Sequence, residues 1–143
     1  MANYEATRSD TNSDDLAKLI LRITLGVLIL FHGVAKLTGG IDFVTGALAK
    51  AGMPAALGYL VYIGEVIAPL FLIAGVWSRA AALVIAINMV VAVLLAHTGQ
   101  LFSISNTGGH ALELQAMYLF TAIALAVMGA GRYSVGGARG RWN

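Results

Sequence analysis

The sequence predicts an all-helical membrane protein, a bundle of four transmembrane helices with a short interfacial or re-entrant segment between the first two. Two observations predict this class. Hydrophobic residues make up 59% of the chain and charged residues only 11%, whereas average soluble domains have about 45–50% apolar and about 25% charged residues. The apolar residues also gather in runs close to the ~20 residues that a helix needs to cross a bilayer. A water-soluble fold is therefore excluded.

The predicted spans are residues 16–37, 57–77, 80–96 and 111–130. Each is expected to be an α-helix, because a backbone inside hydrocarbon must satisfy its own hydrogen bonds. Between the first two spans, Ile41–Gly52 is apolar but too short to cross the bilayer, so we expect it at the membrane surface or as a re-entrant piece. Only Ser78 and Arg79 separate the second and third spans, which predicts an antiparallel helical hairpin, whereas Thr98–Gly109 reads as a polar loop.

The two ends of the chain are expected to be cytoplasmic. Residues 1–15 are polar and acidic, so we expect disorder there and no cleavable signal. Basic residues fall mainly on one side of the spans, where they comprise Arg8, Lys18, Arg79, Arg132, Arg139 and Arg141. By the positive-inside rule, this side is cytoplasmic. We therefore expect a transmembrane domain at 16–133, followed by a basic cytoplasmic tail at 134–143. The expected location is a bacterial-type inner (plasma) membrane.

Composition also restricts the chemistry. The chain has no cysteine, so thiol, disulfide and cysteine-ligated iron–sulfur chemistry are excluded for this chain alone, and a redox role would need a bound cofactor or a partner protein. The net charge is only +2, and no basic run lies on a soluble surface. Nothing therefore points to nucleic acid as a partner, and the lipid bilayer is the expected environment.

Ionisable side chains inside the spans are the functional candidates, because each costs roughly 2.5–3.5 kcal/mol on membrane-insertion scales. They are Arg22, His32, Lys36, Glu65, His97, His110 and Glu113. In the first span, Arg22, Gly26, Ile29, Gly33 and Lys36 share one helix face, and the two glycines would allow close approach of a neighbouring helix. This face is expected to point into the bundle.

Two interpretations of these groups remain open. In the first, His32, Lys36, Glu65, His97 and Glu113 form an outward-facing polar pocket that binds a quinone head group or a small anion and relays protons. In the second, the charges are structural: Lys36 extends to the membrane boundary, and Arg22 forms an ion pair with Glu65 that holds two helices in register. His97 and His110 are as compatible with a solvated position at the membrane boundary as with a role as ligands. His32, His97, His110 and Glu113 are also residue types that ligate metals, but we assign no metal site.

Several short segments, in this order and spacing, resemble the DoxX family of small four-helix membrane proteins. They are Phe31–Leu37, Gly52-Met53-Pro54, Gly64-Glu65, Gly75 with Arg79, Ala111–Gln115 and Gly131–Ser134. The resemblance extends from Asp15 to Val135. It implies a four-span bundle and a membrane oxidoreductase or quinone-linked subunit, since the family is named after a thiosulfate:quinone oxidoreductase of two membrane subunits. It also implies that Arg22, His32, Lys36, Glu65 and Glu113 are the matching polar set.

The leading hypothesis is therefore a quinone-linked or redox-accessory membrane subunit, with quinone as the cofactor that the resemblance suggests and a membrane or redox protein as its partner. One alternative is a non-catalytic structural or assembly subunit. Another is a proton-coupled transporter of a small solute, whose four short spans would require a homo-oligomer. The sequence does not decide whether the protein catalyses a reaction, and names no substrate.

Overall fold

The computed structural model describes residues 2–106, 108–137 and 140–143, with side chains from residue 12 onward in these ranges. Arg139 of the predicted basic tail and Met1 lie outside them. The regular elements are α1 (Ala2–Gly39), α2 (Asp42–Lys50), the 3₁₀ helix η1 (Ala55–Leu60), the π-helix η2 (Ile63–Ile67), α3 (Ala68–Ala74), α4 (Ser78–Ala96), the 3₁₀ turn η3 (Thr98–Gln100) and α5 (Glu113–Met128). The all-helical class is confirmed for this part of the chain.

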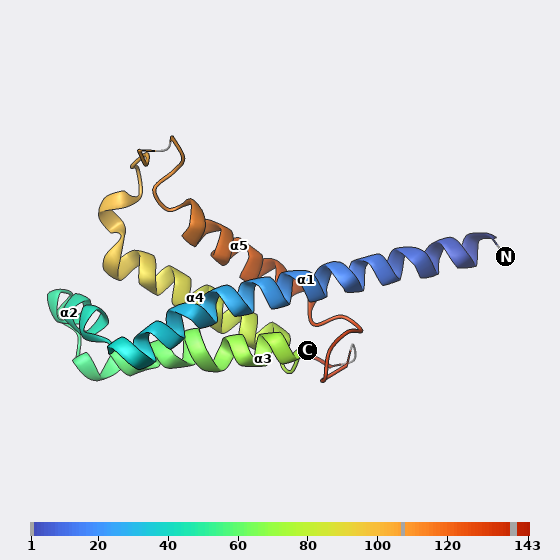
Figure 1. Cartoon of the computed structure of the whole chain (residues 1–143), viewed down its shortest axis with the longest axis horizontal. Helices are drawn as coiled ribbons and strands as arrows, with labels where there is room; N and C mark the ends of the chain where they lie inside the picture. The colour runs from blue at the N-terminus through green and yellow to red at the C-terminus, as the bar shows by residue number, and fades with distance from the viewer. Residues whose placement is uncertain (1, 107, 138–139) are drawn as a thin grey trace.

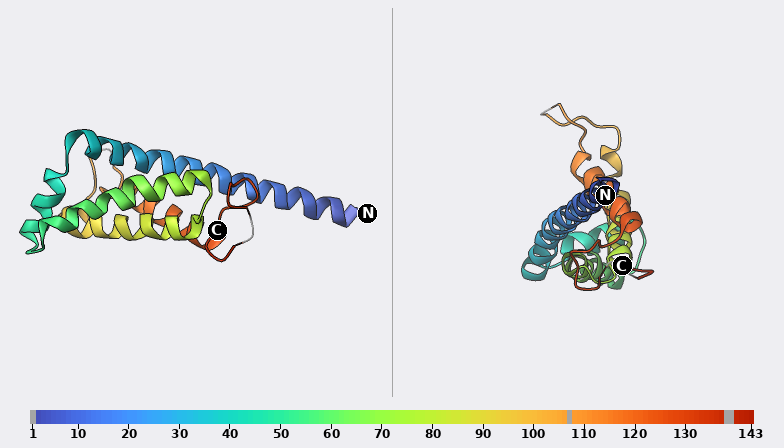
Figure 2. Two further views of the ribbon diagram at one scale, coloured as in Figure 1. Left: turned by 90° about the horizontal axis from the view of Figure 1, so that it is seen from below. Right: turned by 90° about the vertical axis from the view of Figure 1, so that its right-hand side faces the viewer.

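The molecule is elongated, with α1 and α3 along its long axis and α4 and α5 crossing them obliquely (Figure 1). α1 packs against α3 and α5, and α4 packs against α3 and α5. Both termini lie at the same end of the bundle, and the first turns of α1 project beyond it (Figure 2). Within the described ranges, three stretches are long and apolar enough to cross a membrane: Asn12–Gly39, Ala55–Ala74 and Ser78–Ala96. α5 has 16 residues, which gives about 24 Å of rise, less than the ~30 Å of a hydrocarbon core.

α1 differs from the prediction at its N-terminal end. The helix begins at Ala2 and runs through the segment 1–15, for which we expected disorder. Within it, Asp15 is buried and lies 3.7 Å from the ammonium of Lys18 and 3.5 Å from the guanidinium of Arg132. Arg132 also donates to the side-chain oxygen of Asn12 at 2.8 Å. These contacts with the C-terminal segment give residues 12–15 partners that the apolar pattern does not reveal.

The inward face predicted for α1 is confirmed. Arg22, Gly26, Ile29 and Gly33 are buried and Lys36 is half-buried. The two glycines lie against the next span, as expected. A Cβ added to Gly26 would meet Ile73 and the carbonyl oxygen of Pro69, and a Cβ added to Gly33 would overlap the carbonyl group of Glu65.

The second predicted span is a composite of three helical forms. The chain passes from η1 through the π-helix η2 into α3, and Pro69 stands in the first turn of α3. Proline lacks the N–H that would bond the carbonyl of Glu65, and a π-turn is a known way to accommodate such a break. The span ends at Gly75, which adopts the left-handed conformation with φ 73°. The following turn leads directly into α4, so the predicted helical hairpin is present.

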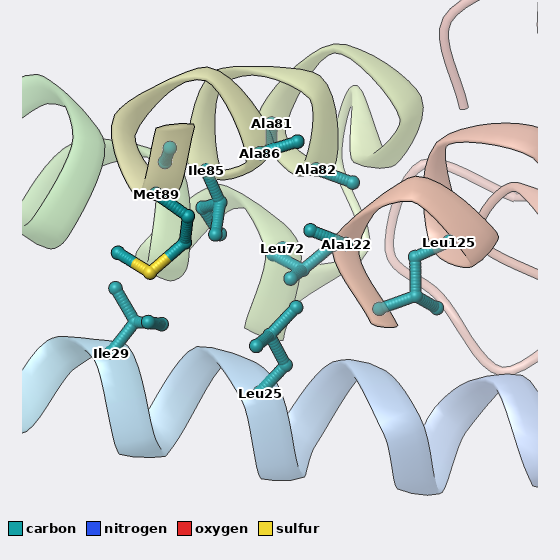
Figure 3. Close-up of a cluster of buried hydrophobic side chains, with 11 residues drawn as sticks. Leu25, Ile29, Leu72, Ala81, Ala82, Ile85, Ala86, Met89, Ala122 and Leu125 are labelled. Carbon is teal, nitrogen blue, oxygen red and sulfur yellow. The ribbon is translucent and has the colours of Figure 1, made fainter. Parts of the chain in front are cut away.

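The segment 41–52 contains the nine-residue helix α2, which packs against η1 and touches α4. The buried core lies between α1, α3, α4 and α5 (Figure 3). Its large members are Leu25, Ile29, Leu72, Ile85, Met89 and Leu125, with Ala81, Ala82, Ala86 and Ala122 filling the closest contacts. At the opposite end from α2, the segment after α5 folds back on the α3–α4 turn, where Val135 N–H donates to Ala74 and Gly136 N–H donates to Gly75.

We expect Gly33→Ala to separate α1 from η2, because the added methyl group would overlap the Glu65 carbonyl. The expected loss of stability is about 1–3 kcal/mol, as for other overpacked contacts, seen as a lower melting temperature in nanodiscs. Gly39→Ala is the matched control, since nothing lies within 4 Å of its Cβ position. Its expected effect is neutral or slightly stabilising, because alanine favours helix. Equal melting of Gly33→Ala and wild type would contradict the close approach.

Candidate functional site

A cavity of about 500 Å³ lies between α1, α2, α4, α5 and the Ala55–Ala74 stretch. Most of its wall is apolar, with side chains such as Ile29, Leu48 and Val84. The polar residues that line it are His32, Lys36, Glu65, Asn88, His97, Gln115 and Tyr118. Four of the five residues predicted to form a pocket therefore line one cavity, whereas Glu113 is not among its lining residues.

The strongest polar contact in the cavity wall joins Lys36 of α1 to Glu65 of η2. Lys36 Nζ donates to Glu65 Oε2 at 2.5 Å, and the two side chains are 23% and 7% exposed. The amide of Asn88 on α4 lies 3.5 Å from the other carboxylate oxygen, at the limit of a hydrogen bond. Tyr62 donates its hydroxyl to the backbone carbonyl of Lys36 at 3.2 Å. The carboxylate is therefore held by side chains from two other helices.

Local backbone features bring these groups together. Glu65 lies inside the π-helix, whose wider turn changes the direction of its side chain relative to a regular α-helix. Gly33 lets α1 approach the Glu65 carbonyl, and Gly64 leaves room for the Asn88 side chain, which a Cβ at position 64 would overlap. The ion pair thus depends on two glycines and one irregular turn.

The two histidines on the cavity wall have different surroundings. His32 contacts Tyr118 of α5 edge to face, with ring centroids 6.3 Å apart. His97 follows the last residue of α4, and its Nδ1 lies 3.2 Å from the amide oxygen of Gln100. His32 therefore links α1 to α5 across the cavity, and His97 lies beside the loop that follows α4.

Glu113 and His110 belong to the start of α5 instead of the cavity. Glu113 is exposed in the first turn of α5, where a carboxylate stabilises the positive end of the helix dipole. His110 accepts the N–H of Leu112 at Nδ1, and its Nε2 lies 3.0 Å from the carbonyl of Leu101. Both ring nitrogens of His110 are therefore occupied by backbone groups of its own loop. No group of three His, Cys, Asp or Glu side chains that could hold a metal occurs among the described residues.

Arg22 has different partners from the one we predicted. Its guanidinium is 1% exposed and donates to the carbonyls of Ala130 at 2.9 Å and Tyr133 at 2.8 Å. Within the described ranges, no ion pair joins it to Glu65. The reason is distance along the helix: Arg22 precedes Lys36 by 14 residues, about 21 Å of rise. Glu65 pairs with Lys36 at one end of α1, and Arg22 holds the C-terminal segment toward the other.

Three polar residues of the cavity wall were not predicted as site residues: Asn88, Gln115 and Tyr118. Asn88 is the only polar side chain in the predicted third span, 80–96, a pattern typical of an interhelical hydrogen bond, although it names no partner. Tyr118 is an aromatic residue away from the ends of α5. Both residues therefore stand out in the sequence, but their contacts, Asn88 with Glu65 and Tyr118 with His32, become visible only once the helices are placed in space.

The family model DoxX matches residues 17–98, which is more than half of the chain. The chain belongs to the DoxX family. The match includes His32, Lys36, Glu65, Asn88 and His97, whereas the α5 side of the cavity lies beyond it. No curated protein and no solved structure matched the chain.

Removing one partner of the Lys36–Glu65 pair should have unequal effects. Lys36→Met leaves the buried carboxylate without its cation, for which we expect a loss of about 3–5 kcal/mol. Glu65→Gln should cost less, because the more exposed ammonium of Lys36 can turn to water. The double variant Lys36→Met/Glu65→Gln should be more stable than Lys36→Met alone. Thermal unfolding of all three variants in nanodiscs gives the coupling, and strictly additive effects would contradict the contact.

We expect Arg22→Lys to release the segment after α5, because one ammonium cannot reproduce the two-carbonyl fork of a guanidinium. Trypsin should then cleave after the exposed Arg132 several-fold faster in detergent micelles, as local opening becomes more frequent. Arg141→Lys, which changes an exposed side chain in the same segment, is the control. Unchanged cleavage in Arg22→Lys would mean that other contacts hold this segment.

Proposed function

We propose that this DoxX-family protein is a quinone-binding, redox-accessory subunit of a bacterial-type inner membrane. The observation that carries the proposal is the Lys36–Glu65 pair, with Asn88 beside it, in the wall of a cavity that is otherwise mostly apolar. Binding sites for small molecules commonly combine an apolar lining with a few convergent polar groups. Ionisable groups at membrane depth are also uncommon and usually functional.

The cavity suits a quinone head group in size and chemistry. Its volume of about 500 Å³ lies within the roughly 300–1,000 Å³ range of ligand pockets. The apolar wall would take the ring and the first part of an isoprenoid tail. The ammonium of Lys36 and the amide of Asn88 are donors for the two carbonyl oxygens, and His32 with Tyr118 supplies aromatic edges at the α5 side.

The chain's own residues would bind the head group and move protons. Reduction of a quinone to a quinol consumes two electrons and two protons. In this proposal Lys36 donates to the quinone oxygen, and Glu65, the carboxylate beside it, relays the protons. Because the chain has no cysteine, the proposal assigns the electrons to a redox partner protein. A further proposed feature is the topology, with α5 as the fourth span, both termini cytoplasmic, and α2 with the cavity toward the outer face.

A second candidate function is a structural or assembly subunit that carries no ligand. It is favoured by one observation: the Lys36 and Glu65 side chains already satisfy each other across two helices. In that case the pair would only hold helices together, and the cavity would be filled by lipid or by a partner's side chain. The experiment below distinguishes the two.

A photoactivatable quinone analogue in native membranes should label peptides from the cavity wall, especially those containing Lys36 and Asn88. We expect the double variant Lys36→Met/Glu65→Gln to reduce this labelling about tenfold, because it removes the ammonium that donates to the quinone oxygen. Glu113→Gln is the matched control, because Glu113 is an exposed carboxylate that does not line the cavity. Both variants are first shown to melt as folded proteins. Labelling spread over lipid-facing peptides, or equal labelling of both variants, would support the structural candidate instead.

A further inference from the structure

A second hollow lies on the outer surface of the helix pair formed by α4 and the Ile63–Ala74 stretch. Its volume is about 200 Å³, and its lining is entirely apolar. The lining residues are Ile63, Ile67, Ala68, Phe71, Trp77, Ala80, Ala81 and Val84. Ile67, Phe71 and Trp77 are all exposed, so this groove opens away from the bundle and toward surrounding lipid.

The groove follows the helix axes. Ile63, Ile67 and Phe71 recur every fourth residue and form one ridge, and Ala80 with Val84 forms the facing side on α4. From Ile63 to Phe71 the helical rise is roughly 12 Å. The small side chains of Ala80 and Ala81 produce the hollow. A linear hydrocarbon chain lying parallel to the helices fits this shape.

Trp77 closes one end of the groove in an unusual conformation. It has φ 48°, the left-handed region that non-glycine residues seldom adopt. Its indole stacks on Phe71 with centroids 6.1 Å apart and remains 64% exposed. Exposed tryptophan is enriched at the boundary between hydrocarbon and head groups. The Trp77 end of the groove is therefore the end suited to the membrane surface.

Positive charge gathers at this same end. Arg79 follows Trp77 by two residues, and its backbone N–H donates to the carbonyl of Trp142 at 3.0 Å, which brings Arg141 to the start of α4. In the ranges that the structure describes, Asp15 pairs with Lys18 and Arg132, and no acidic side chain lies within ion-pair distance of Arg79 or Arg141. Arg79 donates from Nε to the Asn143 carbonyl at 3.1 Å, and the Arg141 guanidinium lies over the Trp142 ring at 5.7 Å from its centroid. Each guanidinium keeps further N–H donors at this end of the groove.

We propose that this groove binds an anionic phospholipid, with one acyl chain between α3 and α4 and the phosphate at Arg79 and Arg141. Guanidinium groups bind phosphate oxygens through paired hydrogen bonds. The expected orientation places this end at the cytoplasmic leaflet, where anionic lipids attract basic segments. The groove faces lipid, so this lipid site would exist whether or not the cavity binds a quinone.

Tryptophan fluorescence tests the proposal directly. The chain has two tryptophans, so Trp142→Phe leaves Trp77 as the single reporter at the groove. The protein is reconstituted in vesicles that contain a small fraction of phosphatidylglycerol or of phosphatidylcholine with brominated acyl chains, which quench indole on contact. We expect brominated phosphatidylglycerol to quench Trp77 about two- to threefold more strongly than brominated phosphatidylcholine, because the basic end selects the head group.

Two variants in this background separate the acyl and head-group contacts. Ala80→Phe fills the groove and should lower quenching by phosphatidylglycerol, whereas Leu83→Phe, at an exposed α4 position outside the groove, should not. Arg141→Gln should reduce the preference for phosphatidylglycerol without changing quenching by phosphatidylcholine. Equal quenching by both lipids, or the same loss in Ala80→Phe and Leu83→Phe, would identify an ordinary lipid shell and overturn the proposal.

Discussion

The contact between Lys36 and Glu65 is the constraint on which the α2 end of the bundle depends. A carboxylate that is 7% exposed in an apolar span must be protonated or paired. Pairing requires that the end of α1 lie directly against the second span, which only a residue without a side chain at position 33 permits. Glu65 lies in the π-turn and Pro69 follows in the first turn of α3, so the backbone is irregular where the carboxylate leaves the helix. The ion pair thus coincides with a close helix approach and an irregular turn.

The buried cation toward the other end of α1 is satisfied differently. Arg22 has backbone carbonyls as its partners, and these come from the segment after α5. A guanidinium carries five donors in a fixed plane, so it can join two carbonyls that an ammonium could not reach together. The result is that α1 is fixed at one end by a side-chain ion pair and near the other by the C-terminal segment. Each contact pairs one charged side chain of α1 with defined partners, which fixes the position of α1 along its neighbours more specifically than apolar packing alone.

The sequence predicted what periodicity and hydropathy encode. These include the inward face of α1, the close approach at Gly26 and Gly33, the α3–α4 hairpin, and three of the four predicted spans, since α5 is shorter than the others. It could not place partners that depend on distance between helices, so Arg22 was matched to Glu65 when about 21 Å of helix rise separates Arg22 from Lys36. Glu113 was placed in the pocket because its charge suggested function, although its position suits the first turn of α5. The contacts of Asn12 and Asp15 could not be read from the local pattern, because their partner Arg132 lies more than a hundred residues away.

Residues inside and outside the family match contribute different parts of the cavity wall. Residues 17–98 supply the ion pair, Asn88 and both lining histidines, whereas α5 supplies Gln115 and Tyr118. A ligand that takes the Lys36 ammonium must offset the lost contact with Glu65, and Asn88 at 3.5 Å is too distant to replace it fully. Binding therefore favours a molecule that gains from the apolar wall as well as from the ammonium. The pair that holds α1 against the second span is thus also the contact that any ligand of the Lys36 ammonium would have to displace.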